Sequence, residues 1–224
     1  MKKLLFFSSF LLTLCFFLNA CSNATKQNSQ NNEKSEFMMT GKNASQKDGS
    51  IDKLKTGIMY VDSENSKIEW IGEKPTGTHD GTINISKGYI EIDKKGDVKK
   101  GEFILDMNSI NCTDLQGKKK QSIEEHLKDA DFFNTTEHPT ASFKINKADS
   151  DTIYGTLTIK GVSQKIKFPY KAHKDTAALT YVAEIIVNRT LFDIKYKSKT
   201  IFPDLGDHFI YDDFKINLNP LVFK

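Results

Sequence analysis

Arginine is almost absent from this sequence. Arg189 is the only arginine in 224 residues. Lysine is plentiful but is scattered among Asp and Glu, so the formal net charge is only +3, and it falls to about +1 without Lys2 and Lys3. Proteins that bind nucleic acid usually carry a concentrated basic face. The composition therefore argues against a nucleic-acid partner.

Recurrent catalytic and metal-binding motifs are also missing. The chain has no G-x-S-x-G turn, and its histidines show neither H-x-x-x-H nor H-E-x-x-H spacing: His79, His126, His138, His173 and His208. We therefore expect no catalytic residue, no metal site and no cofactor, and we interpret the chain as a protein that is not an enzyme. A hydrolase or isomerase is the alternative, and it would need a nucleophile and a base in one pocket.

The long apolar run lies at the N-terminus. Residues 4–18 are nearly all Leu and Phe, preceded by Lys2 and Lys3 and followed by Ala20 and Cys21. The run is shorter than the roughly 20 residues of a membrane-spanning helix, and its three parts are those of a secretory signal peptide, here residues 1–20. Residues 18–21 resemble the bacterial lipoprotein cleavage box, which implies an acylated Cys21 as the lipid anchor. An ordinary signal peptide, with Cys21 incidental, is the alternative.

Cysteine is scarce after the signal. Cys15 leaves with it and Cys21 would be acylated, so Cys112 has no partner in its own chain. We expect an exported domain without internal disulfides, held by an ordinary core. Ser22 is no acidic retention signal, which favours the outer membrane, facing the periplasm.

Residues 21–57 have few apolar side chains and are rich in Asn, Ser, Lys, Gln and Thr. Such a segment buries too little surface to offset its ordering entropy, so we predict a disordered tether after Cys21. As a flexible coil, it would span roughly 30–36 Å.

Residues 58–224 have the period-two hydrophobicity of strands. Turn signals such as Lys160-Gly161 separate the runs. We expect an all-β fold of about eight antiparallel strands, a sandwich or a barrel. The clearest alternation occurs in residues 103–107, 143–145, 157–159, 166–170, 181–187 and 214–218.

One short helix is expected in this domain. Residues 122–125 read as a capping box, with Ser122 as N-cap and Glu125 reaching back. Ile123, Leu127 and Ala130 would share one face, and the helix would pack over an opening or a flank of the sheet.

Several segments resemble the YceI-like family, the lipocalin-like isoprenoid-binding proteins of the bacterial envelope. The likeness spans roughly residues 58–222 in the same order and is carried by residues 107–112 (MNSINC), 125–133 (EHLKDADFF), 138–143 (HPTASF), 155–163 (GTLTIKGVS), 188–194 (NRTLFDI) and 205–214. Two positions depart from the family pattern: Ile123-Glu124 stands where many members have Arg-Asp, and Asp193 where they have Gly.

The resemblance implies an eight-stranded lipocalin-like barrel with one short helix, enclosing an apolar tunnel for a polyprenyl or quinone-like lipid. An eight-stranded barrel is just wide enough for a slender ligand. Partners would then be that lipid and, through Cys21, a membrane; the oligomeric state stays open, a dimer included. The cavity candidates are Phe103, Leu105, Met107, Phe143, Leu157, Phe168, Tyr181, Ile185 and Phe214.

Alternation alone does not distinguish a hollow barrel from a filled one. A structural or stress-related lipoprotein with a solid core is therefore the main alternative. Arg189 has two interpretations as well: a contact to a ligand head group, because guanidinium suits phosphate oxygens, or a structural ion pair with a carboxylate such as Asp193, which we prefer.

Overall fold

The computed structural model of the protein describes residues 57–174 and 178–224. The predicted signal peptide, Cys21 and nearly all of the predicted tether lie outside the described residues. Gly57, the last residue assigned to the tether, is already the first residue of a strand.

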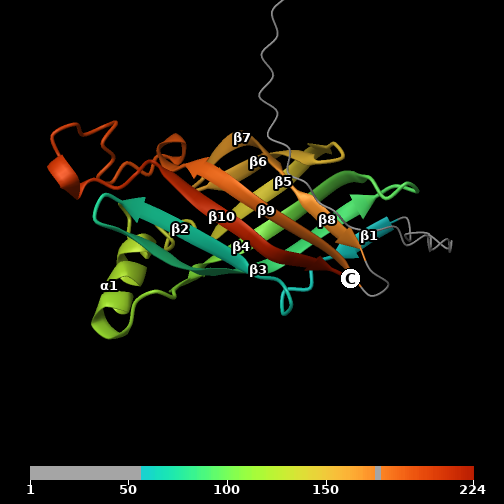
Figure 1. The fold of residues 1–224 in the computed structure, drawn as a ribbon, viewed down its shortest axis with the longest axis horizontal. Coiled ribbons are helices and arrows are strands. Elements are labelled where there is room, and N and C mark those ends of the chain that lie inside the picture. The colour runs from blue at the N-terminus through green and yellow to red at the C-terminus, as the bar shows by residue number, and fades with distance from the viewer. Residues whose placement is uncertain (1–56, 175–177) are drawn as a thin grey trace, which may run out of the picture. The chain divides into compact units, whose positions relative to one another are not determined.

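The described chain is almost entirely β-structure (Figure 1). It comprises β1 (Gly57–Tyr60), β2 (Ile68–Lys74), β3 (Gly77–Ile92), β4 (Val98–Cys112), α1 (Gly117–Lys128), β5 (Thr140–Ala148), β6 (Thr152–Ile159), β7 (Val162–Pro169), β8 (Lys171–Lys174), β9 (Leu179–Asn188), the 3-10 helices η1 (Arg189–Phe192) and η2 (Gly206–His208), and β10 (Asp213–Phe223).

All strands join one antiparallel sheet in the order β7-β6-β5-β4-β3-β2-β10-β9-β8, with β1 added to β3. The prediction of an antiparallel all-β fold with one α-helix is confirmed. The predicted number of eight strands is wrong, because the described residues alone form ten strands in this sheet. The predicted closure is wrong too, since within the described residues no strand pairing joins β7 to the other end of the sheet.

β3 shows why period-two hydrophobicity in the sequence did not reveal every strand. Its apolar residues fall at odd positions early (Ile83, Ile85) and at even positions late (Ile90, Ile92). Register shifts in the pairing with β4, one of them between Ile85 and Lys87, insert the extra residue that changes the parity. β8 gave no pattern because all four of its residues are exposed.

The sheet curls until β7 approaches β9, with Cα atoms of the two strands within 8 Å of each other. Side chains, not a strand ladder, bridge this seam. The Gln164 amide nitrogen on β7 donates to the carbonyl of Leu191, in η1 directly after β9, at 2.9 Å, and the ring of Tyr170, directly after β7, lies 5.0 Å from that of Tyr181 on β9.

The core lies on the concave face of the sheet. β6 and β9 show the alternation most clearly, since every second side chain in each is buried. The inward set of the strands that carry the predicted runs includes Phe103, Met107, Ile145, Leu157, Phe168, Tyr181 and Ile185, all under 9% exposed.

α1 begins at Gly117, five residues before the predicted N-cap Ser122, so the predicted capping box is wrong. The helix start is fixed from β4 instead. Lys120 Nζ donates to the Asn111 side-chain oxygen and to the Cys112 carbonyl, both at 2.6 Å, and the Glu124 carboxylate accepts from the Cys112 amide at 2.7 Å. Within residues 57–174 and 178–224, no helix has the length and apolar character that crossing a bilayer requires.

Candidate functional site

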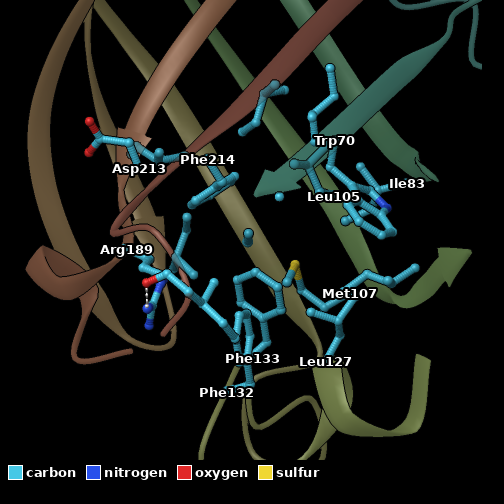
Figure 2. A pocket seen from close by; sticks show the side chains of 18 of the residues that line it. Trp70, Ile83, Leu105, Met107, Leu127, Phe132, Phe133, Arg189, Asp213 and Phe214 are labelled. Atoms are coloured by element: carbon cyan, nitrogen blue, oxygen red, sulfur yellow. Dashed lines mark hydrogen bonds between the residues drawn. The ribbon is translucent and has the colours of Figure 1, made fainter. Parts of the chain in front are cut away.

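Two apolar cavities lie inside the curled sheet. The larger one, about 100 Å³, is nearer α1, and Figure 2 shows its lining. The smaller one, about 70 Å³, lies further along the interior. Leu105, Leu157 and Ile216 line both. The two cavities are therefore consecutive parts of one apolar interior, separated by three aliphatic side chains.

All nine residues predicted from the sequence as cavity candidates line one or both of these spaces. Met107 and Phe214 face the larger cavity and Leu105 and Leu157 face both. The others line the smaller cavity: Phe103, Phe143, Phe168, Tyr181 and Ile185. Their contact with a ligand stays a prediction. Burial raises the pKa of the Tyr181 phenol above its ordinary value.

Sequence reasoning missed the lining from the α1 end and from β2. Leu127, Phe132 and Phe133 contribute to the larger cavity from the end of the helix and the turn that follows it (Figure 2). The rings of Phe133 and Phe214 are 6.4 Å apart, so aromatic contacts close this end. Trp70, from β2, completes the wall, and alternation with Ile68 was the signal that could have identified it.

Two glycines make room for rings that line the cavities. A Cβ at Gly155 would overlap the ring of Phe143, and one at Gly81 would overlap Trp70 and the Asn111 carbonyl. The missing side chain at these strand positions thus lets the two aromatic rings approach the neighbouring backbone closely.

Arg189 is held within the protein. It is 2% exposed and borders the larger cavity. Its Nε, Nη1 and Nη2 donate to the carbonyls of Tyr211, Ile194 and Ile210 at 3.0, 2.9 and 2.9 Å. The guanidinium therefore fastens the loop before β10 to η1. Burial lowers its pKa, and nearby Asp212 opposes that effect.

The expected ion pair between Arg189 and Asp193 is wrong. The carboxylate near Arg189 is Asp212, with Nη2 and Oδ1 3.6 Å apart, whereas Asp193 pairs with Lys195 at 2.5 Å. Asp193 caps η1 with φ 60°, a left-handed conformation. Asp is one of the few residues other than Gly that tolerate it, which explains how this chain departs from the family's Gly there.

Cys112 is free and buried, as a small core residue. Its Sγ lies 3.0 Å from Asp114 Oδ1, and His79 Nδ1 lies 2.8 Å from Asp114 Oδ2. Burial and then the bond to Asp114 raise the pKa of the thiol. Although burial opposes it, the bonds from Cys112 and His79 hold the Asp114 pKa at about 2. Asp114 stands between the thiol and the imidazole, so the three do not form a nucleophile–base pair.

Comparison with known proteins identifies the family to which this fold belongs. The model of the YceI-like domain matches residues 59–220. The chain belongs to the YceI-like family. A UPF0312 protein of Pectobacterium carotovorum is 29% identical over 133 residues, which cover 56% of this chain and 65% of that protein. The match thus spans less than two thirds of the relative's length.

Two solved structures share the fold. BcnA of Burkholderia cenocepacia has a TM-score of 0.59 at 19% identity, over 72% of this chain and 98% of its own. A polyisoprenoid-binding domain of Saccharophagus degradans, implicated in plant cell wall breakdown, has a TM-score of 0.55 at 14% identity, over 76% of this chain and 99% of its own. At 19% and 14% identity, the likeness shows a shared fold alone.

Proposed function

We propose that this protein is a binding protein that holds an isoprenoid-type lipid, polyprenyl or quinone-like, in its apolar interior. The observation that carries the proposal is the pair of consecutive cavities lined by inward side chains of the curled sheet. Family membership and the likeness to a domain described as polyisoprenoid-binding support it.

Holding a hydrocarbon tail requires buried apolar surface and no catalytic group. Burying a tail of about ten carbons gives roughly 8 kcal/mol at ~0.8 kcal/mol per methylene, before association costs. Typical ligand pockets measure about 300–1,000 Å³, and both cavities are smaller. A prenyl tail therefore enters by displacing the side chains that separate them, such as Leu105 and Ile216.

The same proposal places the protein in the cell envelope. Acylation of Cys21 would anchor it to the membrane, on the periplasmic face of the outer membrane, and residues 22–57 would let the barrel-like domain reach the aqueous space. Lipid carriage or storage there is the role that follows. Substituting Cys21→Ser should move the protein from the membrane fraction to the soluble fraction, and unchanged fractionation would contradict the anchor.

The central test is extraction of the full chain, purified from its native host, with organic solvent and mass spectrometry of the extract. We expect a prenyl lipid in near-stoichiometric amount. In Leu105→Trp, the indole would fill the space between the cavities, and the lipid should be lost. A matched outward-facing change, Ile186→Trp on β9, where the side chain is 60% exposed, should retain it. No lipid in the unaltered protein, together with no uptake of prenyl alcohols in vitro, would reject the function.

A further inference from the structure

The segment between η1 and β10 extends beyond the strands at the end of the sheet where α1 lies. In Figure 1 it is the orange-red loop before β10, on the side opposite the C-terminus. Residues 199–205 of this segment, the tip, carry two neighbouring exposed apolar side chains: Ile201 is 37% exposed and Phe202 is 47% exposed. Single exposed apolar residues are ordinary on a protein surface, but an adjacent pair on a projecting loop suggests a contact.

The backbone around the tip is fixed by contacts within the segment. The Ile210 amide donates to the Lys197 carbonyl at 2.9 Å, and the Phe202 amide donates to the Ser198 carbonyl at 2.8 Å. Ser198 is completely buried, and so is most of the Phe209 side chain. The segment thus buries one of its phenylalanines and holds the other outward.

The side chains beside the buried ring combine apolar and polar ends. Tyr211 is exposed and packs edge-on against Phe209, with the ring centres 5.1 Å apart. The Lys199 ammonium lies 4.7 Å from the centre of the same Phe209 ring. Tyrosine rings and lysine stems can lie among apolar groups while the hydroxyl and the ammonium reach water. Such residues beside exposed apolar ones are typical of a membrane–water boundary.

The charge of this segment is nearly balanced. Residues 195–211 contain three lysines and two aspartates, namely Lys195, Lys197 and Lys199 against Asp204 and Asp207. One of the lysines, Lys195, already forms an ion pair with Asp193. Attraction to a charged surface therefore contributes little, and any contact made by the tip depends on its apolar side chains.

The small size of the apolar surface argues against a protein partner. A stable protein interface takes roughly 20–30 residues from each side, whereas the large exposed apolar side chains of this segment are Ile201, Phe202 and Tyr211. A bilayer contact can be this small if the protein is already anchored, because tethering raises the effective concentration. With Cys21 acylated, residues 22–57 would keep the domain within roughly 30–36 Å of the membrane.

We infer that the tip docks on the lipid bilayer, with Ile201 and Phe202 among the acyl chains and with Lys199 and Tyr211 at the boundary with water. The inference rests on the membrane anchoring in the proposed function. The bilayer contact is apolar, so it does not require anionic lipids.

Docking would also orient the apolar interior. Lys197 and Ile210 of the same segment line a groove beside α1, and Trp70 and Leu127 line both this groove and the larger cavity. A docked tip therefore brings the opening of the interior close to the membrane. A prenyl lipid could then pass between bilayer and protein with little exposure to water.

The docking is tested with residues 22–224 held on phosphatidylcholine vesicles by an N-terminal histidine tag and a nickel-chelating lipid, so that the result does not depend on acylation. An environment-sensitive dye would be attached at Thr200→Cys, an exposed position next to Ile201, or at Ala172→Cys on the exposed strand β8 as a control. Cys112 is buried and would stay unlabelled. We expect nitroxide-labelled lipid to quench the dye at position 200 at least about threefold more strongly, also in about 0.5 M salt, because screening does not weaken an apolar contact.

Two double substitutions are matched. Ile201→Ser with Phe202→Ser should abolish the stronger quenching, whereas Val182→Ser with Ile186→Ser, an exposed apolar pair on β9, should leave it unchanged. Equal quenching at both dye positions would overturn the docking, and so would stronger quenching that survives the loss of Ile201 and Phe202. Self-association that only the first pair abolishes, without quenching by lipid, would assign the tip to a second copy of the chain and overturn the bilayer.

The rate of lipid uptake separates the docking site from the cavity. Trp70, the single tryptophan of the chain, lines the larger cavity, so its fluorescence can follow farnesol as it leaves the vesicles. The Ile201→Ser, Phe202→Ser protein should take up farnesol about tenfold more slowly, with its affinity for farnesol added in solution unchanged. An unaltered rate would overturn the role of the tip in uptake. No farnesol uptake by the unaltered protein, with the quenching intact, would reject the proposed function and leave the docking site standing.

Discussion

Leu157→Ala is the substitution that most directly tests whether the interior is one interrupted tunnel. Leu157 is 4% exposed on β6 and lines both cavities. Buried Leu→Ala changes cost about 2–5 kcal/mol, with the larger values where a new cavity opens in tight packing. Because Leu157 already borders empty space on two sides, we expect a cost of about 2–3 kcal/mol.

The same change should improve lipid uptake. Removing the Leu157 side chain joins the two cavities, so a prenyl tail no longer has to displace it. Urea unfolding of the lipid-free protein would measure the loss of stability, and titration with farnesol would measure affinity. Ligand at one hundred times its dissociation constant adds about 2.7 kcal/mol to the free energy of unfolding, which would offset most of the destabilisation.

Leu179→Ala is the matched control. Leu179 is 6% exposed in the same core but lines neither cavity. We expect it to cost about 3–4 kcal/mol and to leave farnesol affinity unchanged. If Leu157→Ala instead cost as much as its control and bound farnesol no better than the unaltered protein, the interior would be a solid core, and the reasoning from the two cavities would be refuted.

Three further outcomes follow from contacts described above. Arg189→Met removes three hydrogen bonds to backbone carbonyls, so it should cost about 3 kcal/mol or more and expose residues 193–212 to protease, measured by limited proteolysis; unchanged cleavage would contradict the fastening role. The pKa of Asp114 is about 2, below its ordinary 3.8, so its stabilisation is complete above about pH 4 and is lost as the pH falls through 2. Asp114→Asn should therefore flatten the decline of the melting temperature between those values. Gly155→Ala should displace the Phe143 ring and lower both the melting temperature and farnesol affinity, whereas an unchanged melting temperature would show that the ring moves freely.

The inward faces of β4, β6 and β9 could be predicted from the sequence because strict alternation survives where strands are regular. This is why the cavity candidates on these three strands, Leu157 among them, line a cavity. β3 could not be predicted in the same way, because its bulges change the parity of its apolar residues. The start of α1 was predicted wrongly because it depends on tertiary contacts. Hydrogen bonds between α1 and the end of β4 position the helix, and no local capping box does so.

A groove of about 750 Å³ beside α1 was beyond sequence reasoning, because its walls come from the hairpin between β2 and β3, from α1 and from residues 196–210, which are far apart in the sequence. Arg189 shows the same limit. Its expected partner, Asp193, is close in sequence, but the backbone turns so that Asp212, from a distant segment, lies beside the guanidinium.

The absence of strand pairing between β7 and β9 among the described residues affects how wide a ligand the proposed binding cavity could hold. A closed barrel, in which every strand is hydrogen-bonded to two neighbours, has a fixed diameter, because widening it would break backbone hydrogen bonds. Among the described residues, widening this seam would strain side-chain contacts such as the bond from Gln164 to Leu191 and the packing of Tyr170 on Tyr181, with no ladder to break. The curled sheet can therefore widen between β7 and β9 while all of its paired strands keep their register.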